Sequence, residues 1–381
     1  MLSAPGRTAL LMGALLSLVI AAPAVAHGHH HGGGDGVRVV ASGLDNPRGL
    51  AFGPDGGLYV TEAGRGGTEC GIPGPEGDPV CFGASGAIAR VDVWHGGQQR
   101  IVEGLPSLAN QDGSAGIGPS DIAFGRHGRA FFTIGLGGSP DLRTQFPDLA
   151  GMAQLYVLKH GKPKSIADLG TFEKANDPDH GQPSAAVDTN PNSVDASGRK
   201  LAVADAGGND LLSLSKHKGI DVLGVLPFTF TPAPPGIPDV PEGTPLPTQP
   251  VPTSIVRGPD GAYYVGQLKG FPFPVGEANV WRIAPGSPPE VYASGFTQIT
   301  DLAFGRDGSL YVLEIATGSL AGPPTPGALI RVKPDGEKVE LAEGALTSPT
   351  GLVLGSHAAY VSNHGAEAGT GEVVRVPLAD H

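Results

Sequence analysis

The chain has 381 residues, of which 40% are hydrophobic and 16% charged, with 61 Gly and 37 Pro. It is too apolar for a disordered protein and too rich in turn formers for a helical one, so an all-β fold is expected. The formal net charge of -12 argues against a nucleic-acid partner, because binding a phosphate backbone requires a basic face.

Residues 1–26 have the pattern of a secretory signal peptide. Arg7 precedes an apolar stretch from Ala9 to about Ala22, and Ala24-Val25-Ala26 offers a small-residue cleavage site. A membrane anchor is the alternative, but the stretch is shorter than the ~20 residues that a spanning helix needs. We therefore expect a secreted, extracellular protein that begins at His27 and has no membrane span after cleavage.

Residues 27–36, HGHHHGGGDG, are expected to form a flexible His/Gly-rich tail. The new amino terminus, His27 and His29 lie close enough in sequence to bind one Cu²⁺ or Zn²⁺ ion. A purely solubilising composition explains the same residues equally well.

A short phrase recurs six times between residues 43 and 363. Each copy has an apolar run, a Gly/Asp turn and a second run centred on a hydrophobic pair. The central pairs are Tyr59-Val60, Phe131-Phe132, Ala202-Val203, Tyr264-Val265, Tyr311-Val312 and Tyr360-Val361. Two further strand-like runs follow in the units, for example 154–161 and 165–170, and the pattern of four antiparallel strands in six units predicts a six-bladed β-propeller.

The sixth unit lacks a fourth strand, and residues 37–44 have the pattern of one. We therefore predict that the N-terminal strand completes the last blade and that residues 37–381 form one propeller domain, which we expect to be a monomer. Residues 227–252 are too rich in Pro for a strand and are predicted to be an extended insertion over one face.

Cys70 and Cys81 are the two cysteines of the chain. In an oxidising compartment an even pair this close, with Gly and Pro between, indicates one disulfide across a loop. A metal pair or a redox dithiol is the alternative, but the spacing is far from that of a Cys-x-x-Cys motif.

The positions just before each first strand should surround the central channel, where a propeller commonly binds its ligand. Sugar-lactone hydrolases of the regucalcin type have a comparable repeat and place metal ligands there; the matching residues here are Arg48, Ser120, Asn192, Thr253, Thr300 and Thr350. One possible ligand in six does not reproduce that site. Asp121 and Asp301, one residue later, could still bind Ca²⁺ with Asn192; the alternative is that these side chains cap strands and hold channel waters.

A second polar set lies where the second strands end. Its members include Glu62, Asp205 and Glu314, and paired carboxylates could act as general acid and base. A solvated strand end explains them equally well, so no catalytic residue is assigned. The loop GFPFPVG, residues 270–276, is either a lid or binding loop or a segment packed on the neighbouring blade.

Several long motifs resemble those of the ScyD/ScyE family of secreted bacterial propeller proteins, with repeats similar to the NHL and SMP-30 types. They are GLDNPRGLAFGPDGGLYVTEAGRGG, CGIPGPEGDPVCFG, VADAGGNDLL, VPTSIVRGPDGAYYVGQLKGFPFPVG and TDLAFGRDGSLYVLEI. The resemblance covers nearly the whole mature chain. It implies a propeller fold and export, and it supplies no catalytic residues.

Three functions fit these observations. The first is a secreted propeller that binds a small ligand or a partner through the loops at the channel mouth. The second is a hydrolase or lactonase assisted by a divalent metal ion near Asp121, Asn192 and Asp301. The third is an interaction scaffold of the cell envelope that uses residues 227–252. Fold class alone cannot decide between them, since propellers host all three.

Overall fold

The computed structural model describes residues 36–75, 77–183, 186–215 and 218–378. The expected signal peptide and the metal-binding candidates His27 and His29 lie outside these residues. Within the part of the chain that the structure describes, no helix is both long and apolar enough to cross a membrane.

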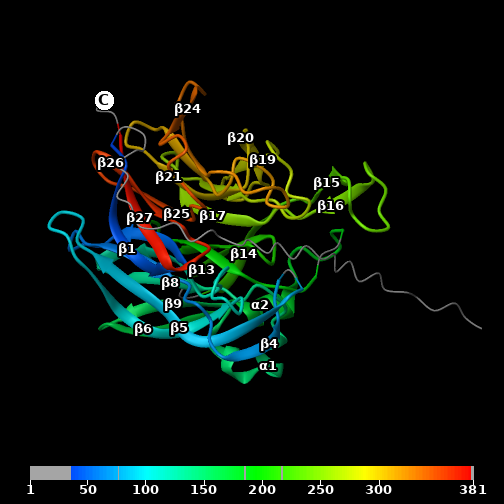
Figure 1. Ribbon diagram of the computed structural model, residues 1–381, viewed down its shortest axis with the longest axis horizontal. Coiled ribbons are helices and arrows are strands. Elements are labelled where there is room, and N and C mark those ends of the chain that lie inside the picture. Colours follow the sequence, from blue (N-terminus) through cyan, green and yellow to red (C-terminus); the bar gives the residue numbers. More distant parts are fainter. Residues whose placement is uncertain (1–35, 76, 184–185, 216–217, 379–381) are drawn as a thin grey trace, which may run out of the picture.

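The protein is a six-bladed β-propeller, as the repeat predicts (Figure 1). Each blade contains four antiparallel strands, given below in order from the strand nearest the channel outwards, and the sheet of blade 1 has β4 (Glu69–Pro73) as a fifth strand. Blade 1 is built from β2 (Pro47–Phe52), β3 (Leu58–Glu62), β5 (Pro79–Val91) and β6 (Gln98–Ala109). Blade 2 is built from β7 (Pro119–Phe124), β8 (Ala130–Ile134), β9 (Gln154–Lys159) and β10 (Lys162–Asp168). Blade 3 is built from β11 (Pro191–Asp195), β12 (Leu201–Asp205), β13 (Asp210–Ser215) and β14 (Gly219–Val225).

Blades 4 to 6 repeat the arrangement. Blade 4 is built from β17 (Pro252–Arg257), β18 (Tyr263–Gln267), β19 (Ala278–Ile283) and β20 (Glu290–Phe296). Blade 5 is built from β21 (Ile299–Phe304), β22 (Leu310–Glu314), β23 (Ala328–Val332) and β24 (Lys338–Leu341). Blade 6 is built from β25 (Gly351–Leu354), β26 (Ala358–Asn363), β27 (Ala368–Pro377) and β1 (Arg38–Asp45). The last blade therefore takes its outer strand from the start of the propeller sequence, which confirms the predicted closure of the ring.

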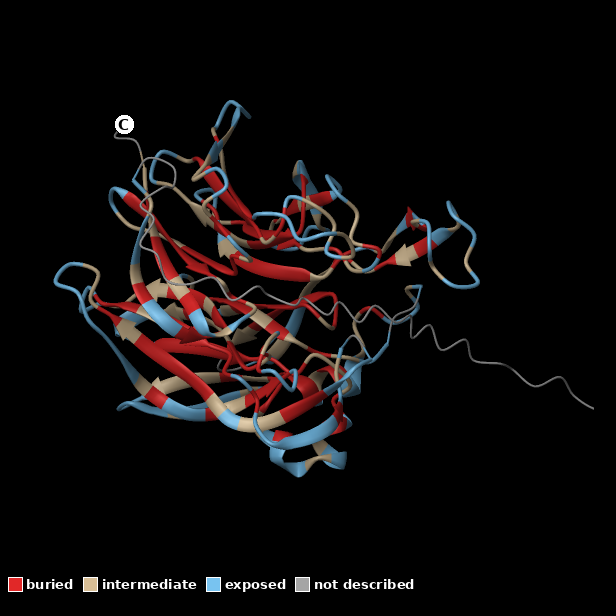
Figure 2. Cartoon of the chain, viewed as in Figure 1, coloured by how far each residue is buried: buried red, intermediate tan, exposed pale blue. Residues whose placement is uncertain are grey.

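The core lies between successive blades. The second residue of each central pair is fully buried, as Val60, Phe132 and Val265 show, and each packs in a cluster with residues of the adjoining blade. Figure 2 shows the same division, with buried residues along the strands and exposed residues in the peripheral loops. The repeated aromatic and Val residues are thus packing positions, because a ring of sheets must bury both faces of every blade.

The two faces of the propeller differ in the length of their connections. We call the face at which the inner strands end the turn face; its connections are short, for example 53–57, 125–129 and 305–309. The face at which the inner strands begin, here the loop face, carries the long segments 135–153, 169–190, 226–251 and 315–327. Most of the irregular structure of the chain therefore lies on one side of the disc.

Two features of the loop face depart from the sequence-based predictions. The insertion 227–252 contains a short hairpin of β15 (Thr229–Pro232) and β16 (Pro245–Thr248), which extends away from the propeller body (Figure 1). Its prolines are compatible with a two-stranded ribbon because each strand has an edge that needs no ladder hydrogen bond. Two short helices, α1 (Leu142–Gln145) and α2 (Leu169–Asn176), were not predicted.

Cys70 and Cys81 form the predicted disulfide. They do not flank an irregular loop, however. Cys70 lies in β4 (Glu69–Pro73), directly opposite Cys81 of β5, so the bond joins the two arms of a hairpin on the loop face. The first part of β5 pairs with β4 and the rest with β3, which accounts for its length of 13 residues.

Candidate functional site

The channel is surrounded by a ring of residues at equivalent positions of the six inner strands. The ring consists of Gly49, Asp121, Ser193, Ser254, Asp301 and Gly351. Small residues are required at the two glycines: a Cβ on Gly49 would lie 2.1 Å from Asp121 Oδ1, and a Cβ on Gly351 would lie 2.3 Å from the carbonyl oxygen of Arg48. The inner strands thus approach one another more closely there than a side chain would permit.

Asp121 connects blade 2 to blade 3. Its Oδ2 accepts hydrogen bonds from Ser193 Oγ and from the amide of Val194, both at 2.8 Å, and its Oδ1 accepts one from the amide of Ile122 at 2.7 Å. Both carboxylate oxygens are therefore engaged by the protein.

Asp301 is the equivalent residue of blade 5, and its carboxylate accepts hydrogen bonds from both neighbouring blades, 4 and 6. Its Oδ1 accepts from Ser254 Oγ at 2.9 Å and from the amide of Leu302 at 2.8 Å, and its Oδ2 accepts from the amide of Leu352 at 2.7 Å. The two aspartates tie neighbouring inner strands together across the blade boundaries, which is a structural role.

Burial raises the pKa of both channel carboxyls. The pKa of Asp121 is about 6, chiefly because the group is removed from bulk water. The pKa of Asp301 is about 7, because of burial and then the negative charge of Asp121. The channel carboxyls therefore titrate near neutral pH.

The residues just before the ring point to the neighbouring backbone. Thr253 Oγ1 donates to the carbonyl of Ile299 at 2.7 Å, Thr300 Oγ1 donates to the carbonyl of Pro349 at 3.2 Å, and Asn192 Nδ2 donates to the carbonyl of Thr253 at 2.6 Å. These bonds agree with the strand-capping alternative. The binding of Ca²⁺ by Asp121, Asn192 and Asp301 stays a prediction.

Ser120 and Arg48 occupy the same position in blades 2 and 1. Ser120 Oγ donates to the carbonyl of Gly118 at 3.1 Å, and Arg48 Nη2 donates to the carbonyl of Gly116 at 2.6 Å. Burial lowers the pKa of Arg48 to about 10. Arg48 thus contributes a positive charge to blade 1 at the equivalent position.

The polar residues at the ends of the second strands are buried, so they are not solvated strand ends. Glu62, Asp205 and Glu314 are at most 4% exposed. Glu62 accepts from the amide of Asp45 at 2.8 Å and Glu314 from the amide of Thr297 at 2.7 Å, in both cases the chain that enters an inner strand. These carboxylates hold the entry of the inner strands in place.

The loop face carries exposed apolar side chains on its insertions. Phe230 is 61% exposed on the β15–β16 hairpin, and Phe271, Val275 and Leu320 are 44%, 56% and 41% exposed on the next two insertions. These four residues are called the apolar rim below. The loop 268–277 does contact the neighbouring segment, because Ser319 Oγ donates to the carbonyl of Pro272 at 3.2 Å, yet Phe271 stays accessible.

A group of buried acidic residues on blade 3 was not recognised from the sequence as one site. Ligand oxygens of Glu173, Asp177 and Asp179 lie within 4.8 Å of one another. Burial and then the charge of Asp205 raise the pKa of Glu173. Burial and then the charges of Asp205, Glu173 and Asp179 raise the pKa of Asp210. The density of acids in 173–188 and the sequence Asp177-Pro178-Asp179 were the available signal.

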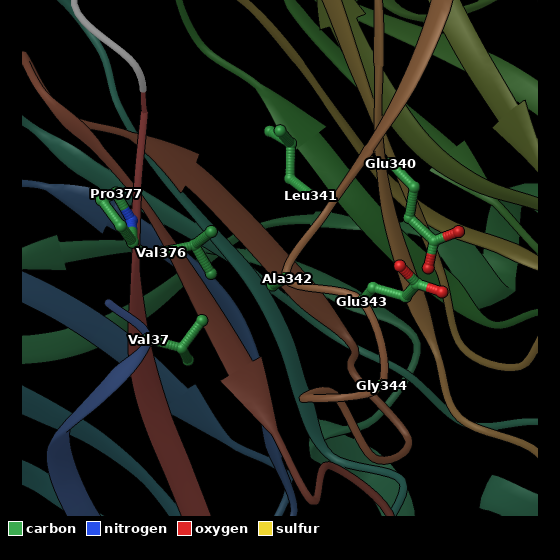
Figure 3. A pocket seen from close by; sticks show the side chains of 8 residues that line it. All are labelled: Val37, Glu340, Leu341, Ala342, Glu343, Gly344, Val376 and Pro377. Atoms are coloured by element: carbon green, nitrogen blue, oxygen red, sulfur yellow. The ribbon is translucent and has the colours of Figure 1, made fainter. Parts of the chain in front are cut away.

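Two surface hollows lie away from the channel. One, of about 660 Å³, is lined by Val37, Glu340, Leu341, Ala342, Glu343, Gly344, Val376 and Pro377 (Figure 3). The other, of about 590 Å³, is next to Arg126, Arg129, Arg199 and Lys200 on blades 2 and 3. Neither contains a residue of the predicted site.

No protein-family model matches this chain, and no curated protein matches it by sequence. Its fold is similar to a structural-genomics protein of unknown function from Bacteroides thetaiotaomicron, with 11% identity, a TM-score of 0.54 and coverage of 90% of this chain and 75% of the other. An auxiliary nutrient binding protein from the same organism gives 8% identity, a TM-score of 0.50 and coverage of 88% and 69%. A putative gluconolactonase has 11% identity and a TM-score of 0.49, with coverage of 91% of this chain and 94% of the other. The first two likenesses show similarity of fold alone.

Proposed function

We propose that the chain is a secreted β-propeller of the ScyD/ScyE type that binds a small ligand, or an apolar part of a partner, on its loop face. The observation that carries this proposal is the difference between the two faces. Long insertions such as 226–251 and 315–327 emerge on the loop face, whereas the turn face has short turns. Binding residues are commonly presented on loops that a rigid scaffold positions.

The apolar rim favours a ligand with aromatic or aliphatic surface. Phe230, Phe271 and Leu320 come from three different insertions, and the amide of Gly270 donates to the carbonyl of Gln249, so that the second insertion lies against the first. Exposed aromatic side chains of this kind supply large contact area and stacking at a binding surface.

Export is supported by the disulfide between Cys70 and Cys81 as well as by the signal sequence. Disulfides persist in oxidising compartments and are rare in the cytosol. The binding surface would therefore face an extracellular ligand or an envelope component.

Metal-assisted hydrolysis in the channel has less support than binding. Both oxygens of Asp121 and of Asp301 accept protein hydrogen bonds, and Asn192 Nδ2 is bonded to a backbone carbonyl. A use of Asp121, Asn192 and Asp301 as metal ligands would require these inter-blade bonds to be shared with the ion.

The proposal is tested by screening aromatic and aliphatic metabolites against the mature protein, with thermal shift first and calorimetry for the hits. We expect Phe230→Ala and Phe271→Ala to weaken binding of a hit about tenfold each, since hot-spot aromatic residues contribute more than ~1 kcal/mol. Trp94→Ala is the matched control, because Trp94 is 71% exposed on the turn face. Binding that is lost in the Trp94 variant and retained in both Phe variants would contradict the proposed surface.

A further inference from the structure

The acidic group of blade 3 is formed by two parts of the chain. Glu173 lies in α2, and Asp177 and Asp179 follow directly after this helix. Asp210 begins β13 and lies opposite Asp205 of β12. The two parts are in close proximity, because a Cβ on Gly208 would lie 3.0 Å from Glu173 Oε2 and 3.6 Å from Asp210 Cγ.

Several oxygens of this group are buried and have no hydrogen-bond partner. Asp210 is 0% exposed, and neither of its carboxylate oxygens has a partner; Glu173 is 1% exposed, and its Oε1 has none. Asp177 Oδ1 and Asp179 Oδ1 are also without partners. Buried polar groups are almost always paired, so a cluster of unpaired oxygens in one place calls for a ligand.

Protonation does not remove the difficulty at Asp210. A neutral carboxylic acid still needs an acceptor for its O–H group, and both oxygens of Asp210 lack partners of either kind. The charges that act on Glu173 are those of the carboxylates Asp205, Asp179, Asp177 and Asp188. The charges that act on Asp210 are those of the carboxylates Asp205, Glu173 and Asp179. No basic side chain is among these principal charges.

Asp205 shows the contrast within the same turn. It accepts hydrogen bonds from Thr189 Oγ1 and the amide of Asn190, both at 2.6 Å, and from the amides of Gly207 and Gly208. The protein therefore satisfies one buried carboxylate of the turn fully and leaves its neighbour Asp210 open.

We propose that this group is a Ca²⁺-binding site, with Glu173, Asp177 and Asp179 as ligands and Asp210 facing the ion from the β12–β13 side. Ca²⁺ takes six to eight oxygen ligands at about 2.3–2.6 Å, so oxygens on opposite sides of the ion are separated by about 4.8 Å. The ligand atoms of Glu173, Asp177 and Asp179 lie within 4.8 Å of one another, so all three can bind one ion of this size. A Mg²⁺ shell, with ligands at about 2.0–2.1 Å, is smaller and more rigid.

The site would act on the loop face. Asp179 Oδ2 accepts from Asn209 Nδ2 at 3.0 Å, and Asn209 Oδ1 accepts from the amide of Val251, at the end of the long insertion. Gln182, in the same loop as Asp179, accepts from the amide of Phe228 at the start of that insertion at 3.1 Å. Bound Ca²⁺ would therefore fix the loop of Asp179, which contacts the start of the insertion directly through Gln182 and its end through Asn209. This proposal does not depend on the proposed function.

The test uses the mature chain after removal of metal with EDTA, and measures Ca²⁺ and Mg²⁺ binding by calorimetry and the thermal midpoint with each ion. We expect one Ca²⁺ per chain, a higher midpoint with Ca²⁺, and a smaller effect of Mg²⁺ at the same concentration. No heat and an unchanged midpoint with Ca²⁺ would overturn the site, and an equal response to Mg²⁺ would overturn the assignment to Ca²⁺.

Two variants identify the residues. Asp177 has a positive φ of 42° as the C-cap of α2, a conformation that Asn tolerates, so Asp177→Asn should fold; Glu173→Gln removes a buried charge. We expect each to weaken Ca²⁺ binding at least about tenfold without lowering the midpoint of the metal-free protein. Asp221→Asn, on an exposed position of β14 in the same blade, is the control. Full Ca²⁺ affinity in both Asp177→Asn and Glu173→Gln would overturn the site.

Discussion

Val39 of β1 lies directly opposite Val374 of β27, and the ladder between these strands closes the ring. The buried residues of β1 should therefore contribute to global stability. We expect Leu44→Ala to lower the free energy of unfolding by about 2–5 kcal/mol, since Leu44 is 1% exposed. Val39→Ala is the control, because Val39 is 50% exposed on the same strand, and its effect should be below ~0.5 kcal/mol. Urea unfolding followed by fluorescence measures both. Equal effects would show that closure does not depend on the buried face of β1.

Arg100 is expected to be important for blade 1. Its guanidinium donates to both carboxylate oxygens of Glu62, at 2.9 and 2.6 Å, and to Asp45 at 3.0 Å. Because Glu62 is completely buried, Arg100→Met would leave its charge unpaired and should cost about 3–5 kcal/mol. The comparable Arg90→Met breaks an exposed pair with Asp55 and should cost less than ~1 kcal/mol. Denaturant unfolding of both variants at neutral pH measures the two losses of stability. A similar loss in both variants would show that the buried pair of Arg100 and Glu62 is no more important than the exposed pair.

The disulfide should stabilise the loop face of blade 1. Cys70 and Cys81 are 11 residues apart, and closing a loop of this length is worth ~3 kcal/mol in the chain-entropy model. The double variant Cys70→Ala/Cys81→Ala should therefore melt at a lower temperature than the oxidised protein. Alkylation before and after reduction, followed by mass measurement, establishes the redox state of the sample. Two free thiols in the exported protein would contradict the expected bond.

The titration of the channel residues Asp121 and Asp301 should make the protein less stable as the pH rises. The pKa of Asp301 is about 7 and that of Asp121 about 6 in the folded protein, whereas both are near 3.9 in an unfolded chain. A carboxyl with a raised folded pKa stabilises the fold fully below the unfolded pKa, and this contribution is lost as pH rises through the folded pKa. The loss between about pH 4 and 7 should be on the order of a few kcal/mol.

Asp301→Asn separates this effect from other titrations. The variant should be less stable at pH 5, because one of the amides of Leu302 and Leu352 loses its acceptor, but its stability should vary less between pH 5 and 8. Thermal midpoints in metal-free buffer at several pH values measure both. An unchanged pH dependence would show that Asp301 does not titrate in this range.

The repeat made the blades predictable because it is a local pattern. Each unit has an apolar run, a turn and a second run in which the second residue of the central pair is buried, as Val60 and Phe132 illustrate. These features depend on neighbours in sequence and on the two-residue period of a strand. Even the closure could be predicted, since a missing strand in the last unit and an extra one at residues 37–44 complement each other.

The acidic group could not be predicted in the same way, because its members are brought together by tertiary structure. Glu173 and Asp210 belong to segments separated by a whole hairpin, and their proximity follows from how α2 packs beside the β12–β13 turn. The eight residues of α2 are likewise too few for a clear helical period. Its N-cap, Asp168, which accepts from the amide of Thr171, was the visible signal. The hairpin β15–β16 was missed because Pro normally argues against strands.

The direction of the closing strands determines how this protein can be attached to a surface. Arg38 begins β1, and β27 ends at Pro377; Leu378 donates its amide to the carbonyl of His357, in a turn of the turn face. Both ends of the described propeller thus leave from the side opposite the insertions. Immobilisation through either end should keep the insertions directed toward the medium, so that tethered and free protein capture the same molecules equally well.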